Sequence, residues 1–429
     1  MMDRFPILAW PIGDINEKTV SEVKLWAEAG LTANISPRFD PETHDKEMMY
    51  ELLDECEKCG IKLIVFDVRT SWRIASEGDE VYRTSFKKAY ADFGSHPATL
   101  GFFIGDEPMK ADMQNVITAT RIQLEEAPEL LPFCNLLPIW PESKPPYMGY
   151  GDLDSYVKDV KENLPGKIVS YDRYTQMWGT EQGKETYFHD MRIYKDIADA
   201  KGLPLWTCLL SVAHWAYQTP NEDHFKWQLN TALAGGCNGI IWFTLNEPDE
   251  SSYRNAPIDK FGEKSLAFYY LSRVCREFHA STSDIFKDLT LDECYHVGKA
   301  WGGWQKFEPG VSDVLLDVKT FSVLGNNDYS NAEMIVSFFT HKNGDKYLAV
   351  VNNSPTINDL NFCLTFNKNN CDPYEIRTFG NKKRVFSSYS NRVDMNFDPN
   401  RIDSSVNSKE SCFSVNLWAS AGQMYLFRL

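Results

Sequence analysis

The stretch TLGFFIGDEP, residues 99–108, is the most informative part of the chain, because an apolar run of strand length passes directly into two acids and a proline. Seven other short runs, rich in β-branched and aromatic residues, share its texture; they begin at Phe5, Leu31, Ile61, Leu131, Gly166, Leu203 and Cys237. The eight starts are 26 to 38 residues apart, and each interval holds one strand, one helix and two loops. The spacing predicts eight βα units.

The segments between these runs have the pattern of amphipathic helices. NEKTVSEVKLWAEAG (16–30) and DKEMMYELLDECEKCG (45–60), for example, both end at a glycine, as helix C-termini commonly do. Eight alternating units with strands apolar enough to be buried on both faces predict an α/β fold, a closed (β/α)8 TIM barrel. An open doubly wound sheet is the alternative, but WPIGDINE (10–17), after the first strand, is not the Gly-rich phosphate loop typical of that fold.

Beyond about residue 310 the pattern changes to short alternating strands. In MIVSFFTHKNGDKYLAVVNN (334–353), Asn343-Gly344 separates two β-rich runs and predicts a hairpin. SCFSVNLWASAGQMYLFRL (411–429) predicts two more strands around an Ala-Gly turn, and residues 281–312 are expected to connect the two parts. We therefore predict a catalytic barrel over 1–300 and a C-terminal antiparallel β-sandwich over 301–429.

The charges disfavour some partners. The chain carries 44 Lys and Arg against 60 Asp and Glu, a net charge of −16, and the two signs are interspersed, so nucleic acid and anionic membrane surfaces are poor candidates. No stretch reaches the length of a membrane span, and the first residues lack the apolar core of a signal peptide. A removed export signal would place the protein in the periplasm or outside the cell, so the compartment stays open, as does the oligomeric state.

The ten cysteines are spread along the chain, mostly inside apolar runs, which is typical of reduced, buried thiols. The one CxxC, Cys56 and Cys59, lies in a helical pattern without a second pair. No second histidine stands at metal-ligand spacing from His214, and the chain has no Walker or dinucleotide fingerprint. We expect neither a metal nor a cofactor.

Functional groups of a (β/α)8 barrel project from the C-terminal ends of its strands. The fourth strand ends in Asp106 and Glu107, and two adjacent carboxylates beside apolar residues are costly to ionise together. One of the two pKa values should therefore be raised, which leaves a proton available to a general acid. Glu107 is the candidate.

The GDEP after the fourth strand, the GIIWFTL of the eighth strand (239–245) and the trailing β-rich part together resemble the clan A glycoside hydrolases, including the β-galactosidase-like family 42. The resemblance implies that Glu107 is the acid/base, with Asp106 where the clan has an Asn. The clan's nucleophile is a Glu at the end of strand seven, and LPLWTCLLSVAHW (203–215) has no carboxylate there. The retaining mechanism of the clan is therefore not carried over whole.

Glycoside hydrolysis commonly needs a second carboxylate, and three candidates stay open. Asp172, in IVSYDRYTQMW (168–178), follows a strand and has tyrosines on both sides. Glu247, in WFTLNEPDE (242–250), matches the clan's Asn-Glu-Pro by its letters but ends the eighth strand. Asp106 could act through a water molecule.

The other candidates for the site are aromatic or polar residues near strand ends, where sugar rings pack on indoles and hydroxyls find partners. We expect the following to bind substrate: Trp10, Trp72, Asp106, Asn135, Trp140, Tyr174, His214, Trp215 and Asn246. Taken together, the sequence predicts a glycoside hydrolase that cleaves O-glycosidic bonds of an oligo- or polysaccharide. The alternative is a catalytically degenerate barrel that binds glycans without hydrolysis.

Overall fold

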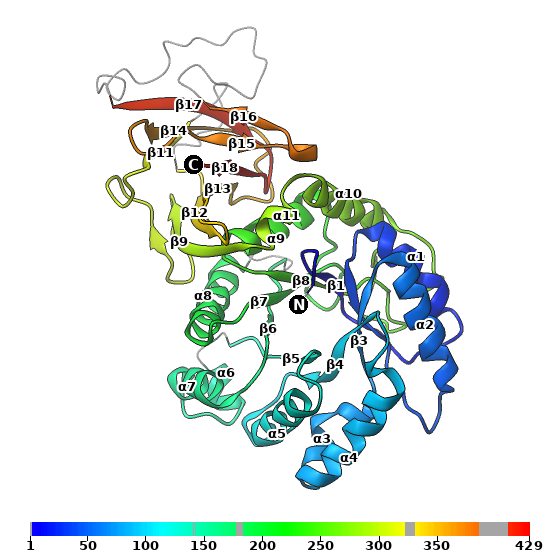
Figure 1. The fold of residues 1–429 in the computed structure, drawn as a ribbon. Helices are drawn as coiled ribbons and strands as arrows, with labels where there is room; N and C mark the ends of the chain where they lie inside the picture. Colours follow the sequence, from blue (N-terminus) through cyan, green and yellow to red (C-terminus); the bar gives the residue numbers. More distant parts are fainter. Residues whose placement is uncertain (1, 140, 142, 177–182, 322–330, 386–410) are drawn as a thin grey trace. The chain divides into compact units, whose positions relative to one another are not determined.

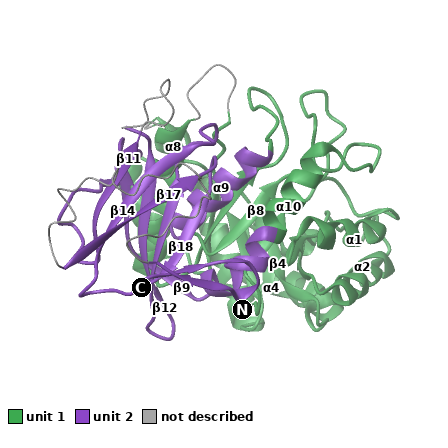
Figure 2. Cartoon of the chain, turned by 90° about the horizontal axis from the view of Figure 1, so that it is seen from above, with its two compact units in different colours: residues 1–221, 237–276 green, residues 222–236, 277–429 purple. Residues whose placement is uncertain are grey.

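A computed structural model describes residues 2–139, 141, 143–176, 183–321, 331–385 and 411–429. The chain divides into two compact units, coloured separately in Figure 2. The first unit comprises residues 1–221 and 237–276, and the second comprises residues 222–236 and 277–429. The predicted domain boundary at residue 300 stays a prediction.

The first unit is built on eight parallel strands, which form two sheets with the orders β1-β8-β7-β6 and β2-β3-β4-β5. The strands are β1 (Ile7–Ala9), β2 (Ala33–Ile35), β3 (Lys62–Val65), β4 (Thr99–Asp106), β5 (Leu131–Asn135), β6 (Val169–Asp172), β7 (Leu205–Leu210) and β8 (Gly239–Phe243).

Backbone hydrogen bonds close the two sheets into one barrel. At one seam the Thr32 N–H donates to the Ile7 carbonyl at 2.9 Å, and at the other the Leu136 N–H donates to the Ser170 carbonyl at 2.8 Å. These bonds join β1 to the segment before β2, and the end of β5 to β6. The predicted (β/α)8 barrel is confirmed.

Helices follow the strands and surround them (Figure 1). In this unit they are α1 (Thr19–Ala29), α2 (Lys46–Cys59), α3 (Trp72–Ala75), α4 (Asp79–Ala89), α5 (Lys110–Glu126), α6 (Lys144–Tyr147), α7 (Leu153–Asn163), α8 (Lys184–Lys201) and the start of α10 (Leu266–Ser281). The α2 helix shows why the local sequence suffices: the Asp45 carboxylate accepts from the Glu47 N–H at its start, and Gly60, with φ 68°, ends it.

Aromatic and aliphatic side chains fill the barrel interior, as expected for a packed core rather than a pore. Phe103 of β4 stacks on Phe133 of β5 with ring centroids 5.8 Å apart, and Trp206 of β7 and Ile241 of β8 are fully buried beside them. This floor supports the strand ends above it.

The second unit carries two antiparallel sheets with the orders β9-β12-β13-β18-β15-β16 and β11-β14-β17, and the short β10 lies parallel to β9 at the edge of the larger sheet. The strands are β9 (Leu289–Val297), β10 (Gln305–Lys306), β11 (Leu315–Phe321), β12 (Met334–His341), β13 (Lys346–Asn352), β14 (Leu360–Asn367), β15 (Tyr374–Ile376), β16 (Lys382–Arg384), β17 (Cys412–Ala419) and β18 (Met424–Arg428).

Buried residues of both sheets form one core, among them Val336 and Val350 from the larger sheet and Phe362 and Leu417 from the smaller. The predicted β-sandwich is therefore confirmed, as is the hairpin at Asn343-Gly344, which joins β12 to β13.

Helix α9 (Glu222–Ala234) packs on the larger sheet of this unit. The Ser337 hydroxyl donates to the Ala234 carbonyl at 2.8 Å, and the Trp227 indole N–H donates to Asn353 Oδ1 at 2.9 Å. A helix that stands between β7 and β8 in the sequence thus covers the outer face of a sandwich sheet.

One sequence expectation for this unit needs correction, and another is confirmed. The stretch 281–312, predicted as a connector, contains α11 (Ser283–Phe286), β9 and β10. The last two strands lie on either side of the Ala-Gly turn, as predicted, but they belong to different sheets, since β17 pairs with β14 while β18 pairs with β13 and β15.

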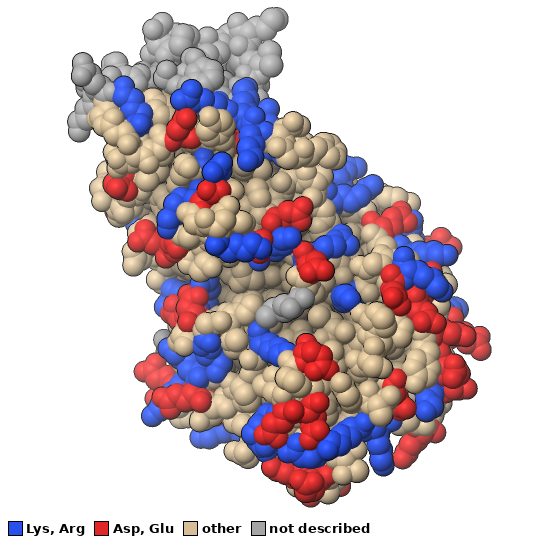
Figure 3. Space-filling view, in the orientation of Figure 1, with Lys and Arg blue, Asp and Glu red and all other residues tan. Residues whose placement is uncertain are grey.

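The surface charges, the helices and the cysteines agree with the expectations from the sequence. Basic and acidic side chains alternate over the face drawn in Figure 3. Within the described residues, every helix is too short or too polar to cross a bilayer. All ten cysteines are free thiols.

Candidate active site

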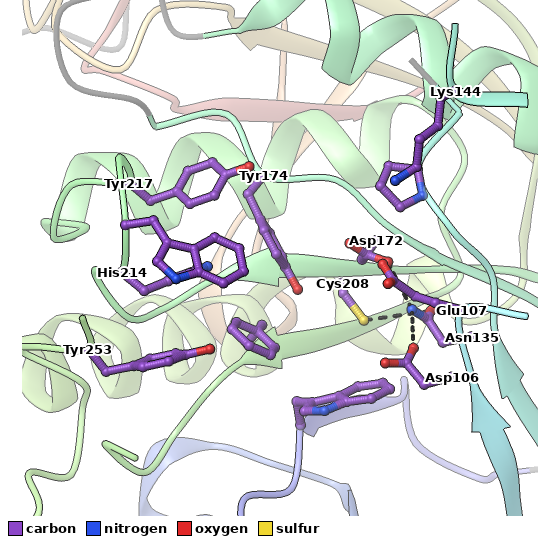
Figure 4. Close-up of a pocket in the computed structure, with 14 residues that line it drawn as sticks. Asp106, Glu107, Asn135, Lys144, Asp172, Tyr174, Cys208, His214, Tyr217 and Tyr253 are labelled. Carbon is purple, nitrogen blue, oxygen red and sulfur yellow. Dashed lines mark hydrogen bonds between the residues drawn. The ribbon is translucent and has the colours of Figure 1, made fainter. Parts of the chain in front are cut away.

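The register between neighbouring strands builds the site, because it brings the ends of β4, β5 and β6 beside Cys208 of β7. Asp106 of β4 pairs with Asn135 of β5, and Asp172 of β6 pairs with Cys208 of β7. Their side chains meet at the mouth of the barrel, in a cavity of about 370 Å³ (Figure 4). The described residues that line it are Trp10, Asp106, Glu107, Asn135, Pro138, Lys144, Asp172, Tyr174, Cys208, His214, Trp215, Tyr217, Phe243 and Tyr253.

The backbone at the end of β4 places Glu107 in this cavity. Glu107 has φ 50°, a left-handed conformation that non-glycine residues seldom adopt, and its N–H donates to the Asn135 carbonyl at 2.9 Å. Two residues earlier, a Cβ on Gly105 would lie 2.0 Å from the ring of Trp72. The strand can therefore end in this form only with glycine at position 105.

Three carboxyl groups share one hydrogen-bonded cluster. Asn135 Nδ2 donates to Asp106 Oδ1 at 3.3 Å and to Asp172 Oδ1 at 3.0 Å. Glu107 joins the cluster through its N–H, which donates to the Asn135 carbonyl, and its charge acts on Asp172. The cluster therefore runs Asp106, Asn135, Asp172, Glu107.

Burial and mutual repulsion raise the pKa values of these acids. Burial, followed by the charges of Glu107 and Asp106, holds the pKa of Asp172 well above its usual value. The Asp106 carboxyl faces the water in the cavity yet is surrounded by protein, and this desolvation, with the charge of Glu107, raises its pKa to about 7. At neutral pH the cluster thus keeps at least one proton.

The charge of Lys144 limits the rise in the pKa of Glu107. Burial raises the pKa of Glu107, while the ammonium of Lys144, on the short α6 helix, and the hydrogen bond to Asp172 both lower it. A carboxyl with a raised pKa beside a cation can deliver a proton near neutral pH and tolerate the charge that remains.

The other side of the cavity is aromatic (Figure 4). The His214 ring stacks on Tyr253, with centroids 5.1 Å apart and planes 8° from parallel, and lies 5.3 Å from the ring of Phe243. Burial lowers the pKa of His214, so its imidazole is neutral at pH 7. Its Nδ1 faces the Val212 carbonyl at 3.2 Å and must carry the ring proton, which leaves Nε2 as an acceptor.

Trp215 forms the rim. Its side chain is 72% exposed, although its backbone has φ 45°, a second left-handed non-glycine residue at the site. An exposed indole beside a cavity offers a flat face on which a sugar ring can pack.

The structure brings most of the predicted site residues together and separates the others. Those around the cavity are Trp10, Asp106, Glu107, Asn135, Asp172, Tyr174, His214 and Trp215. Glu247 is not among them: its carboxylate accepts from the Ala256 N–H at 3.2 Å. Trp72 is buried under Gly105, and Trp140 lies outside the described residues.

Asn246 lines a smaller cavity of about 80 Å³, which shares Trp10 with the larger one. Glu22 of α1 reaches this cavity, where burial raises its pKa and a hydrogen bond with Asn246 opposes that rise. Asn246 thus faces a neighbouring compartment.

Sequence reasoning missed six lining residues: Pro138, Lys144, Cys208, Tyr217, Phe243 and Tyr253. Cys208 lies within β7 and Phe243 is the last residue of β8, and in apolar strands both residue types indicate packing. The other four lie on loops or a short helix, whose course the periodicity does not predict. Cys208 reaches the cavity because the strand register pairs it with Asp172, and this register is not visible in the sequence.

Among the described residues, the acidic, thiol and imidazole side chains that could hold a metal ion together are Asp54, Glu57 and His96, whose ligand atoms lie within 4.8 Å of one another. They lie on α2 and before β4, away from the cavity-lining set, and His96 Nε2 is 3.1 Å from Asp54 Oδ1.

Comparisons with known proteins agree with the fold. No family model and no curated protein sequence matches the chain. A solved family 5 glycoside hydrolase from Bacteroides vulgatus is similar to this chain. The match covers 99% of this chain and 89% of that protein, with 9% sequence identity and a TM-score of 0.55. A structure described as a glycoside hydrolase is similar over 99% of this chain and 92% of its own, with 10% identity and a TM-score of 0.51.

The chain spans about half the length of other similar structures. A GH2 β-galacturonidase from Eisenbergiella tayi is covered over 48% of its length and matches 61% of this chain, with 13% identity and a TM-score of 0.43. The fold is that of (β/α)8 glycoside hydrolases, as the resemblance to clan A implies. The finer resemblance to family 42 stays a prediction.

Proposed function

We propose that the protein is a glycoside hydrolase in which Glu107 donates the proton to the glycosidic oxygen. The observation that carries the proposal is the cluster of Asp106, Glu107 and Asp172 at the barrel mouth, facing aromatic rings. Carboxyl groups that hold a proton near pH 7 beside stacking surfaces are what glycosidic cleavage requires.

Asp172 is the first partner of Glu107. Burial raises the pKa values of both carboxyls, so the pair retains a proton that Glu107 can deliver when substrate arrives. The glycosidic oxygen takes this proton as the C1–O bond breaks, and a water molecule forms the new bond to C1 while its proton passes to the ionised Asp172.

The walls of the cavity suit a sugar. Trp10 and Trp215 offer indole faces to C–H surfaces, while Tyr174 and His214 Nε2 offer a hydroxyl and an acceptor to sugar hydroxyls. The loops around the cavity select the sugar, the linkage and the anomer.

A second candidate function is glycan binding without cleavage. The end of β7 favours it, because the stretch 203–215 carries no carboxylate, whereas clan A enzymes carry a nucleophilic Glu at the end of this strand. This candidate needs the same aromatic walls but no proton transfer.

The test is hydrolysis of a broad panel of aryl glycosides and oligosaccharides by the wild-type protein and by Glu107→Gln. We expect the wild type to cleave at least one substrate and the variant to lose about 10²- to 10⁴-fold in kcat. Cleavage that survives the substitution would overturn the role of Glu107. Glycan binding on an array without any cleavage would favour the second candidate.

A further inference from the structure

Asn135, at the end of β5, uses every hydrogen-bonding position of its side-chain amide. Its two N–H bonds face Asp106 and Asp172 at 3.3 and 3.0 Å. Its Oδ1 accepts from the Ser170 hydroxyl at 2.9 Å and lies 3.8 Å from the Cys208 thiol (dashed in Figure 4 except for Ser170). An Asn side chain offers two donors and two acceptor sites, so none remains for a substrate.

The backbone of the same residue holds the acid. The Asn135 carbonyl accepts from the Glu107 N–H at 2.9 Å, directly at the residue with φ 50°. Asn135 is also the register partner of Asp106 across β4 and β5. One residue therefore contacts all three acidic residues of the cluster, two through its side chain and one through its backbone.

The chemistry of the neighbours requires an amide at this position. Ser170 and Cys208 orient the oxygen, which turns the NH₂ group toward the two aspartates. A neutral donor between two acids stabilises their ionised forms, and the hydrogen bonds from Asn135 lower the pKa values of Asp106 and Asp172 against the effect of burial. A leucine of similar size would remove both donors, and an aspartate would add a further negative charge.

We propose that Asn135 is a positioning residue, which sets the spacing and protonation of the Asp106, Glu107 and Asp172 cluster and does not bind the substrate. Its effect on catalysis rests on the proposed function, but its effect on the protonation of the cluster does not. The proposal replaces the expectation that Asn135 contacts the sugar.

Other charged and titratable groups face the cluster and stay unchanged in the test. They are Lys144 beside Glu107, Arg173, Tyr174, Tyr194 and Tyr217 around Asp172, and Cys134 and Cys208 beneath the aspartates. Arg173 is itself anchored, since its Nε donates to the buried Asp190 at 2.8 Å. A change in titration on altering Asn135 is therefore assigned to the amide.

The experiment titrates the side-chain carboxyls of ¹³C-labelled wild type, Asn135→Leu and Asn135→Asp by NMR, which needs no substrate. We expect the pKa values of Asp106 and Asp172 to rise by about one unit or more in Asn135→Leu, because a hydrogen bond to a charged group is lost from each, and to rise further in Asn135→Asp. On a substrate that the wild type cleaves, kcat should fall about 10- to 100-fold while KM changes less than about threefold.

Asn34→Leu is the matched control. Asn34 is a buried asparagine on β2, 4% exposed, whose Oδ1 accepts from the Ala9 N–H at 3.0 Å, so its loss costs stability without touching the cluster. Unchanged carboxyl titration in both Asn135 variants would overturn the proposal, as would a large rise in KM at constant kcat. If Asn135→Leu does not fold, the isosteric Asn135→Asp carries the test.

The two proposals can fail separately. Raised pKa values in a protein that cleaves nothing would remove the proposed hydrolase and keep the assignment of Asn135. If the protein is an active hydrolase and the Asn135 variants titrate as the wild type does, the proposed hydrolase stands and the assignment of Asn135 is removed.

Discussion

A Glu-Pro pair follows two strands of the barrel, β4 and β8, and the structure places the two glutamates differently. At the end of β4, Glu107 precedes Pro108 and lines the large cavity; after β8, Glu247 precedes Pro248 and does not. The Glu107 carboxyl lies in the cavity with Asp106 and Asp172, whereas the Glu247 carboxylate accepts the Ala256 N–H at 3.2 Å. Glu107 thus lies in the cavity, whereas Glu247 stabilises the loop that follows β8.

The backbone explains the difference. Glu107 leaves its strand with φ 50° and is tied to the neighbouring β5, so its side chain turns toward the barrel mouth. Beyond β8 the chain folds back on itself, and the Glu247 N–H donates to the Ile258 carbonyl within the same loop. An acid-proline pair thus becomes a candidate catalyst only where the adjacent strand takes up its backbone.

The largest expected effect separates these two glutamates. Glu107→Gln should lower kcat on any cleaved glycoside by about 10²- to 10⁴-fold, because it removes the proton donor. Glu247→Gln should leave kcat within about threefold, since the amide oxygen can still accept from Ala256. Steady-state kinetics of both variants on one substrate measure the contrast, and similar losses in the two would contradict it.

The next effect concerns the strand end that positions Glu107. Gly105→Ala places a methyl group 2.0 Å from the Trp72 ring, and overpacking of this kind costs about 1 to 3 kcal/mol of unfolding free energy. Urea denaturation followed by tryptophan fluorescence would report the loss. Activity should fall with it, because β4 must shift to relieve the clash.

Gly262→Ala is the control from the β8 side. Gly262 has φ 86°, and a Cβ at this position would meet nothing within 4 Å, so only the left-handed backbone opposes the change, at roughly 1 to 2 kcal/mol. A Gly105 variant with full activity would show that Trp72 does not constrain the end of β4.

A smaller effect is expected in pH dependence. Asp106→Asn removes a negative charge beside Glu107 and Asp172, so their pKa values fall and protons leave the cluster at lower pH. The alkaline limb of kcat/KM should then move down by about one pH unit. An alkaline limb that stays in place would show that the limb belongs to a group outside the cluster.

The same variant has a readout without substrate. The folded-state pKa of Asp106, about 7, lies above the usual 3.8, so the folded protein binds this proton more tightly and loses stability as pH rises from about 4 to 7. Asp106→Asn should lose less thermal stability over that range than the wild type does. Because the group faces water, the difference should be modest.

The smallest expected effect is an upward shift of the alkaline limb of kcat/KM. Lys144→Met removes the cation that lowers the pKa of Glu107, so Glu107 holds its proton to higher pH. The alkaline limb should move up by about half a unit, because the side chain is partly exposed and its charge is screened. A downward shift in this variant would contradict the assignment of the limb to Glu107.

Sequence patterns were enough to predict the barrel and the sandwich, because strand and helix periods, Gly-terminated helices and an Asn-Gly turn are local properties of the chain. They also pointed to Glu107 and Asp172, since both directly follow apolar strands. They did not predict that α9 packs on the sandwich sheet, or that β17 and β18 lie in different sheets, because both depend on pairing between distant segments.

Tertiary contacts determined which polar groups meet. Nothing in the letters around Asn135 indicates that its amide would be used up by Ser170, Cys208 and two aspartates; strand register brings those residues, from β4, β6 and β7, to one level. Nor do the letters distinguish Glu107 from Glu247, because the backbone partner that turns one of them into the cavity comes from another strand. Local patterns determine elements, whereas hydrogen bonds and charge interactions between elements determine the protonation of a site.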